Sequence, residues 1–292
     1  MELHTAQSPL PTLYHAEPSY YSQVVRLVME EEGINYISRE TDIHSKQEQS
    51  SDWYLNMNPA GVVPTLLWAG KPVCESKDIS IFVVDNLSHN DNGLLSVNRD
   101  DVLEMVEFHY EQCLIEPLTF STLASKNKVN PGQCSLSWYY NVDNIQFMAT
   151  IINKKMSGGL AKLEKSKIAN PDLSSELDKK IAALKERMKI FQDPQKTQDE
   201  ALAKMMPVLD RLEERLGRAQ FVCGETYSLA DCLYTCTLAR LAMVGLLDNL
   251  LTQRPRLARW WAAVQVRQSF KKAGIVSFGL GQVLIKRMCV IL

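Results

Sequence analysis

Hydrophobic positions in the first 90 residues change period several times, from short strand-like runs to helical spacing and back. The predicted order is strand 12–14, helix from Ser22 to Gly33, strand 34–43, short helix 53–57, hairpin strands 64–68 and 72–74, and helix 76–87. Gly33 is typical of a helix C-cap, and the residues between the hairpin strands include Gly70. This pattern predicts a compact α/β domain over residues 10–90.

Strand signals disappear after Asn98, and helical spacing predicts an all-α domain over residues 98–272. The expected helices are 102–120, 176–191, 201–216, 229–247 and 256–266. A long insertion at about 126–196 contains the pairs Gly158-Gly159 and Asn170-Pro171, which predict a division into separate helices or loops. Residues 273–292 form a basic and apolar tail.

Charge and cysteine content narrow the functional classes. The net charge of −2 divides into +8 after Asp248 and −10 before it, so the C-terminal end is expected to meet anionic surfaces. Apolar residues interrupt the basic residues at this end, and the sequence shows no motif of a nucleic-acid-binding fold. Both observations disfavour nucleic-acid binding. The seven cysteines are scattered without a double CxxC spacing, so we expect no metal site and a reducing compartment. No secretory signal is visible, which favours the cytoplasm.

Four separated segments carry a resemblance to a known family. They are residues 13–27 (LYHAEPSYYSQVVRL), 58–66 (NPAGVVPTL), 74–76 (CES) and 221–231 (FVCGETYSLAD). In this order they resemble the glutathione transferase superfamily, over about residues 12–272. The chain looks most like the plant tetrachlorohydroquinone dehalogenase-like class, and more distantly like the ganglioside-induced differentiation-associated group, with which it shares the long insertion.

The resemblance implies a thioredoxin-like N-terminal domain that holds glutathione, followed by an all-helical domain. It also implies a glutathione transferase (EC 2.5.1.18-like) that uses glutathione as co-substrate with a small electrophile, for conjugation, peroxide reduction or dehalogenation. A homodimer is a possible assembly. The alternative is a membrane-associated adaptor that keeps the fold and has little turnover, in the manner of some relatives with the long insertion.

Serines at the start of the first helix are the candidate catalytic residues. Glutathione must react as a thiolate, and lowering a thiol pKa from about 8.5 to below 7 takes roughly 2 to 3 kcal/mol. One hydroxyl donor to a charged sulfur contributes about 1.5 to 3 kcal/mol, and a helix N-terminus about 0.3 to 1. Ser19 is the first candidate and Ser22 the second, while either serine can instead be a plain helix cap. The segment Ser-Tyr-Tyr-Ser cannot form the disulfide of a CxxC oxidoreductase.

The glutathione-binding residues follow from the resemblance. The bond before Pro64 is cis in this superfamily, which turns the Val63 N–H and C=O toward the cysteinyl part of the ligand. Glu75 and Ser76 open the next helix, where they would hold the γ-glutamyl ammonium and carboxylate. Lys46 is a candidate partner for the glycyl carboxylate. Each has a simpler reading: a trans proline opening a strand, an acid in a first helical turn, and a solvated loop lysine.

Ser228 and Asp231 have the spacing of a capping box, so we expect them to be structural. By the usual value of a cap, replacing Asp231 should cost about 0.5 to 2 kcal/mol.

The sequence ends in Cys-Val-Ile-Leu, the C-a-a-X form in which a final leucine directs geranylgeranylation of Cys289. A lipid together with nearby basic residues would attach the protein to the cytosolic face of a membrane. The alternative is an unmodified apolar end. The apolar run 273–285 is too short to span a bilayer.

Overall fold

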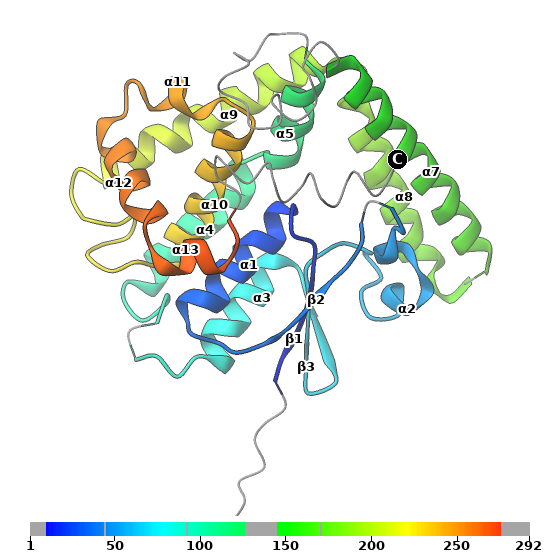
Figure 1. Ribbon diagram of the computed structural model, residues 1–292, viewed down its shortest axis with the longest axis horizontal. Coiled ribbons are helices and arrows are strands. Elements are labelled where there is room, and N and C mark those ends of the chain that lie inside the picture. The colour runs from blue at the N-terminus through cyan, green and yellow to red at the C-terminus, as the bar shows by residue number, and fades with distance from the viewer. Residues whose placement is uncertain (1–9, 44, 92, 126–144, 170, 276–292) are drawn as a thin grey trace, which may run out of the picture.

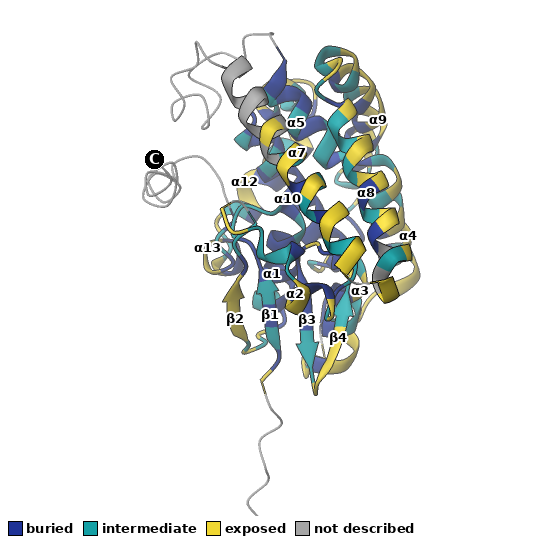
Figure 2. Ribbon diagram, turned by 90° about the vertical axis from the view of Figure 1, so that its right-hand side faces the viewer, coloured by how far each residue is buried: buried dark blue, intermediate teal, exposed yellow. Residues whose placement is uncertain are grey.

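The computed structural model describes residues 10–275 except 44, 92, 126–144 and 170. A four-stranded sheet with the order β2-β1-β3-β4 lies at one end of the molecule, below the helices in Figure 2. The strands are β1 (Thr12–His15), β2 (Ile37–Glu40), β3 (Thr65–Trp68) and β4 (Lys71–Cys74). β1 pairs with β2 in parallel, whereas β1 with β3 and β3 with β4 are antiparallel.

Helix α1 (Tyr20–Glu31) makes the crossover between the two parallel strands and is the link to the rest of the molecule. Its apolar residues, from Val24 to Met29, are fully buried. They pack against α3 (Ser76–Phe82) and against α10 (Leu229–Met243). α3 continues as a π-helical turn at Val83–Leu87. α1 therefore belongs to the core of both parts of the fold.

The connection from β2 to β3 holds a 3-10 turn (Glu48–Ser50) and the short helix α2 (Asp52–Leu55). The larger part of the chain is helical (Figure 1). Its helices are α4 (Arg99–Gln112), α5 (Ile115–Ala124), α7 (Ile145–Ala169), α8 (Ser174–Lys189), α9 (Pro194–Arg215), α10, α11 (Leu247–Leu251), α12 (Pro255–Gln265) and α13 (Gln268–Lys272). α10 is apolar and buried around nearly its whole circumference, as expected of a central core helix.

Two predictions in the helical part are wrong for a clear physical reason. The expected helix 102–120 is two helices: α4 ends at Gln112 and α5 begins at Ile115. A continuous helix is disfavoured because Pro117 has no N–H to donate to the carbonyl of Cys113, and its ring would clash with that carbonyl. The pair Gly158-Gly159 does not divide the insertion: it lies inside the continuous helix α7. The cost of about 1 kcal/mol per helical glycine is tolerated in a 25-residue helix packed against α8.

The mixed α/β and all-helical architecture expected from the sequence is confirmed. Cys289 and the rest of residues 276–292 lie outside the described residues. Within the described ranges, no helix combines the length and the apolarity needed to cross a bilayer.

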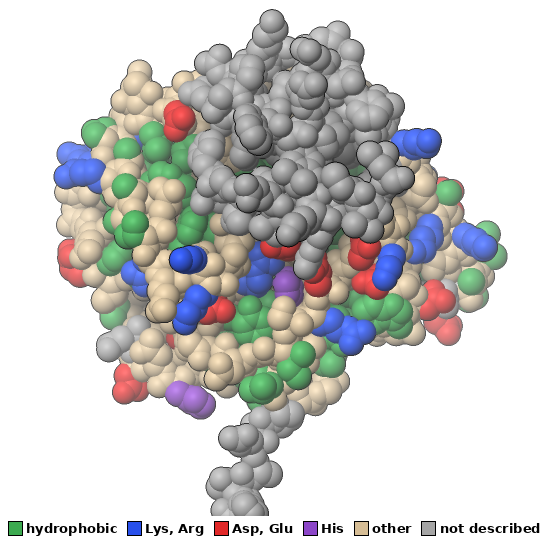
Figure 3. Space-filling view, in the orientation of Figure 1, with side chains coloured by type: hydrophobic (Ala, Val, Ile, Leu, Met, Phe, Trp, Pro, Cys, Tyr) green, Lys and Arg blue, Asp and Glu red, His purple; other side chains and the backbone are tan. Residues whose placement is uncertain are grey.

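Two of the basic residues after Asp248 have partners inside the fold, which reduces the positive charge that the C-terminal end offers to other molecules. Arg254 pairs with Asp210 at 2.6 Å, and Arg267 pairs with Glu31 at 2.6 Å. On the face shown in Figure 3, basic and acidic side chains lie side by side.

Candidate glutathione site

The ends of three strands meet at one edge of the sheet, and the candidate residues follow or precede these ends. The register pairs Tyr14 with Thr65 and Thr65 with Cys74. The end of β1, the start of β3 and the end of β4 are therefore neighbours. Ala16 and Val63 pack into one small buried cluster with Tyr54. This edge brings the start of α1, the segment before Pro64 and the start of α3 together.

The structure separates the two candidate serines by their burial. Ser19 is the N-cap of α1, so the helix begins at Tyr20, two residues earlier than the expected start at Ser22. Ser19 is half-buried, and its Oγ accepts from the Ser22 N–H at 3.4 Å. No described residue accepts the Ser19 hydroxyl proton, which leaves it available to a ligand. Ser22 is fully buried, and its Oγ accepts from the Ala16 N–H at 3.3 Å inside the loop.

A buried polar network behind Ser19 holds the start of α1 in place. The Tyr20 hydroxyl hydrogen-bonds His109 Nε2 at 2.9 Å and Thr237 Oγ1 at 3.0 Å, which joins α1 to α4 and α10. Burial lowers the pKa of His109 to about 3, so the ring is neutral. Arg240 Nη2 donates to the Pro18 carbonyl at 2.8 Å, directly before Ser19. No local pattern in the sequence indicates this network, because its members are up to 222 residues apart.

The segment before β3 contains Val63, a buried residue. The Val63-Pro64 peptide bond is cis. The preceding carbonyl, that of Val62, accepts from the Tyr54 hydroxyl at 2.8 Å and from Asn58 Nδ2 at 3.1 Å. Within the described part of the chain, the Val63 N–H and C=O have no hydrogen-bond partner. Both groups are therefore available to a peptide-like ligand lying along this edge.

At the start of α3 the two predicted residues differ in exposure. Glu75 is exposed and has φ +65°, a left-handed conformation that is uncommon for a non-glycine residue. Ser76 is buried, and its hydroxyl hydrogen-bonds the Tyr110 hydroxyl of α4 at 2.8 Å. Burial raises the pKa of nearby Tyr21 to about 12, with smaller contributions from Glu116 and Glu75. Ser76 is thus oriented by the helical part of the chain.

Lys46 is exposed on the loop before the 3-10 turn, and the insertion contacts that loop. Lys162 Nζ of α7 donates to the carbonyls of Gln47 and Lys46 at 3.3 and 3.4 Å. Lys180 Nζ of α8 donates to the Gly61 carbonyl at 2.7 Å. Burial lowers the pKa of Lys180 to about 7, with smaller contributions from the charges of Arg187 and Lys162. No local pattern in the sequence predicts these contacts.

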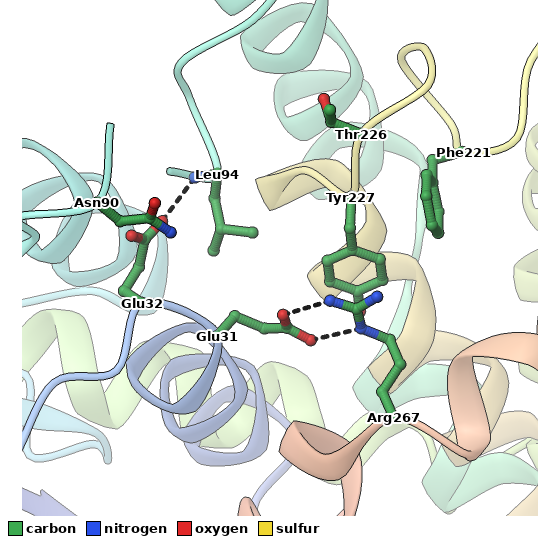
Figure 4. Close-up of a pocket in the computed structure, with 8 residues that line it drawn as sticks. All are labelled: Glu31, Glu32, Asn90, Leu94, Phe221, Thr226, Tyr227 and Arg267. Atoms are coloured by element: carbon green, nitrogen blue, oxygen red, sulfur yellow. Dashed lines mark hydrogen bonds and ion pairs between the residues drawn. The ribbon is translucent and has the colours of Figure 1, made fainter. Parts of the chain in front are cut away.

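A pocket of about 340 Å³ lies at the other end of α1, away from Ser19 (Figure 4). Glu31 and Glu32 point into it, and both carboxylates have partners within the chain. Glu31 accepts from Arg267 and Ser269, and Glu32 accepts from Ser88 and from the Leu94 N–H. Arg267 lies 4.0 Å from the centre of the Tyr227 ring. Because its charges are already paired, we interpret this pocket as part of the structural contact between α1 and the C-terminal helices.

Ser228 and Asp231 lie at the start of α10, remote from the strand ends. The Asp231 carboxylate accepts from the Ser228 N–H, the Ser228 hydroxyl, the Val222 N–H and Trp260 Nε1, at 2.6 to 3.0 Å. Burial raises the pKa of Asp231 to about 6, although these four donors favour the charged form. Among the described residues, no group of three or more His, Cys, Asp or Glu side chains is placed to bind a metal ion.

Comparison with known proteins gives two family-model matches. Residues 18–85 match the N-terminal domain of glutathione S-transferases, and residues 195–263 match the C-terminal domain. The two ranges thus match both domains of the glutathione S-transferase family, in the family's order. The matched ranges leave α4, α5, α7 and α8 between them, so the insertion is outside both.

Relatives in this superfamily match most of the chain at low identity. The tetrachloro-p-hydroquinone reductive dehalogenase of Sphingobium chlorophenolicum is 24% identical, over 92% of this chain and 97% of its own length. The glutathione S-transferase TCHQD of Arabidopsis thaliana is 24% identical, over 89% of this chain and 88% of its own. The human ganglioside-induced differentiation-associated protein 1-like 1 is also 24% identical, over 89% and 72%. These matches agree with the class that the sequence resembles.

Solved structures confirm the glutathione transferase fold. Glutathione transferase F7 from Populus trichocarpa superposes with a TM-score of 0.63 at 19% identity, covering 91% of this chain and 100% of that one. The β-etherase LigF from Sphingobium sp. strain SYK-6 has the same TM-score at 22% identity, covering 91% and 98%. A glutathione transferase-type function is thus supported by sequence and fold together.

Proposed function

We propose that this protein is a glutathione transferase in which the Ser19 hydroxyl stabilises the glutathione thiolate. The observation that carries the proposal is the half-buried Ser19, whose hydroxyl proton has no acceptor among the described residues. It lies at the N-terminus of α1, where the helix dipole also favours an anion. The 2 to 3 kcal/mol or so needed to ionise the thiol at neutral pH is within reach of these two effects together.

Glutathione would lie along the edge formed by the strand ends. Its cysteinyl part would pair with the free N–H and C=O of Val63, as an added strand pairs with an edge. Glu75 would take the γ-glutamyl ammonium, and the start of α3 with Ser76 would take the neighbouring carboxylate. Lys46 would take the glycyl carboxylate. The tripeptide orientation follows from these three contacts.

Attack by the thiolate on a small electrophile is the reaction that the site favours. The sulfur forms the new bond to an electrophilic carbon, and the leaving group departs with its electron pair. The start of α1 carries Ser19 and Ser22 and no cysteine, so a step that needs a protein thiol at this position has no candidate. This favours conjugation over redox exchange through the chain.

The test is the pKa of enzyme-bound glutathione, measured from thiolate absorbance in the ultraviolet across a pH series. We expect a value below about 7 in the wild type and a return toward about 8.5 in Ser19→Ala. With an activated aryl halide, kcat/KM should fall about 10- to 100-fold at neutral pH, the loss of about 1.5 to 3 kcal/mol. Glutathione affinity should change much less.

Ser22→Ala is the matched control, because it removes a hydroxyl three residues away that faces the interior. A raised thiol pKa in Ser22→Ala with no change in Ser19→Ala would reverse the assignment. Wild-type protein that does not bind glutathione at all would point instead to a non-catalytic protein with this fold.

A further inference from the structure

The insertion between α5 and α9 contacts one small region of the sheet domain. Its two helices α7 and α8 pack against each other and lie beside α2 in both ribbon views (Figures 1 and 2). The contacts fall on residues 46–61, between β2 and β3. This is the segment that leads into Val63 and that carries Lys46.

An apolar contact anchors the insertion on α2. Leu55, the last residue of α2, is fully buried in a cluster with Leu163 of α7 and with Leu177 and Ile181 of α8. This cluster is separate from the main core. Burial of a leucine side chain contributes about 1.5 to 3 kcal/mol, so α2 depends on the insertion for part of its stability.

Lys180 fixes the backbone directly before Val63. Its Nζ donates to the Gly61 carbonyl at 2.7 Å and approaches the Gln49 carbonyl at 3.5 Å. Gly61 has φ +55°, and a Cβ there would lie 1.6 Å from Lys180 Nζ. The glycine therefore provides both the left-handed turn and the space for the lysine. A partly buried ammonium is costly without acceptors, which favours keeping both carbonyls in place.

Lys162 makes the corresponding contact from α7. It donates to the carbonyls of Lys46 and Gln47 at 3.4 and 3.3 Å, on the loop that carries the candidate for the glycyl carboxylate. Two lysines from two insertion helices thus hold the two ends of the same segment. Neither lysine forms an ion pair in these contacts, since all the acceptors are backbone carbonyls.

We propose that the α7–α8 insertion is a clamp that pre-orders the glutathione-binding segment, and that Lys180 is its main positioning residue. Holding the Gly61 carbonyl sets the path of the next two residues, and with it the direction of the Val63 N–H and C=O. A segment ordered before binding loses less conformational entropy when the ligand arrives, so affinity rises. This proposal rests on the proposed function for its ligand, although the clamp itself is a property of the free protein.

The test compares Lys180→Met with Lys179→Met in the full-length protein. Methionine keeps a long side chain but removes the donors, and Lys179 is an exposed neighbour on the same helix. We expect the glutathione Kd and KM to rise about 3- to 10-fold in Lys180→Met, with kcat at saturating glutathione within about twofold of the wild type. Lys180→Arg, which keeps charged donors, should restore most of the affinity.

Hydrogen exchange of the free protein provides the readout that does not depend on catalysis. Amides of residues 46–63 should exchange faster in Lys180→Met and not in Lys179→Met, with Lys162→Met giving a smaller effect in the same range. Unchanged exchange in Lys180→Met would overturn the clamp. Faster exchange with unchanged glutathione affinity would overturn its positioning role.

These outcomes separate this proposal from the proposed function. If the wild type does not bind glutathione, the proposed function fails, and exchange in residues 46–63 still decides whether the clamp exists. If Lys180→Met does not fold, the same exchange and affinity measurements on Lys162→Met decide the question.

Discussion

Helices α1 and α10 both start with a serine N-cap, and the two starts differ in how fully their polar groups are satisfied. At α10, Ser228 and the Asp231 carboxylate form a closed set with Val222 and Trp260, buried in the interior. At α1, Ser19 accepts one long bond of 3.4 Å and remains half-buried, and its hydroxyl proton has no acceptor in the described part of the chain. The same residue type therefore stabilises the fold in one place and remains available to a ligand in the other.

The difference between the two helix starts comes from an acidic residue in the first turn of α10. α10 has Asp231 at the third helical position, whereas the first turn of α1 contains no acidic residue. An acid at the start of α1 would compete with an incoming thiolate for the same N–H groups and would repel its charge. An unsatisfied helix start beside free backbone groups is consequently a sign of a binding site.

Removing the Asp231 carboxylate at the start of α10 should have the largest effect on stability. Asp231→Ala leaves the Val222 N–H and the Trp260 Nε1–H buried without an acceptor, in addition to removing the cap. Since each unsatisfied buried donor costs about 1 to 3 kcal/mol, we expect the free energy of unfolding to fall by about 3 to 5 kcal/mol, more than a cap alone would give. Urea titration measures it, with the exposed Glu225→Ala as control. A loss below about 1 kcal/mol would contradict the four-donor geometry.

Low pH should destabilise the fold through two buried histidines, one of which, His109, belongs to the polar network behind Ser19. Burial lowers the pKa of His109 to about 3, and burial with the Arg26 charge lowers that of His15 to about 4. The unfolded chain binds these protons near pH 6.5 and the folded chain does not, so stability is full above that pH and falls as the pH drops. Between pH 7 and pH 5, each histidine should lower the free energy of unfolding by about 2 kcal/mol.

The measurement is the difference between wild type and His109→Gln in unfolding free energy across that pH range, since the variant lacks one of the two contributions. Parallel pH curves for the two proteins would show that His109 does not stay neutral in the fold.

Removing either serine hydroxyl should have the smallest effect on stability, and the loss should be larger for Ser228 than for Ser19. Ser228→Ala removes a 2.6 Å hydrogen bond to a buried carboxylate and should cost about 1 to 2 kcal/mol. Ser19→Ala removes a long, half-exposed bond and should cost about 0.5 kcal/mol or less. Denaturant midpoints at constant m-value measure both. The comparison fails if Ser19→Ala proves the more destabilising of the two.

Local patterns predicted most of the elements around the site. Gly33, Gly70 and the Pro64 region set the limits of α1, the hairpin and β3, because such residues act on their own neighbours. The second strand was predicted too long: β2 is an exposed edge strand of four residues, where burial gives no alternating signal. The candidate glutathione-binding residues near the strand ends follow from the resemblance to glutathione transferases. The strand register brings their segments to one edge of the sheet.

Contacts between distant segments could not be predicted from local patterns in the sequence. Tyr20 meets His109 across 89 positions and Lys180 meets Gly61 across 119, and nothing in the local composition of either partner indicates the other. The local cost of Gly158-Gly159 in a helix predicted a break, but the packing of α7 on α8 outweighs that cost. The residues that position the site are mostly of this long-range kind.

The first helix is held by the last described one. Arg26 donates to the Ala273 carbonyl at 2.8 Å and Arg267 pairs with Glu31, so each contact spans more than 230 positions. During synthesis, the sheet domain would leave the ribosome long before the residues that complete its central helix. The N-terminal third therefore gains part of its stabilisation only when the C-terminal helices are in place, and we expect the described parts of the fold to unfold in a single cooperative transition.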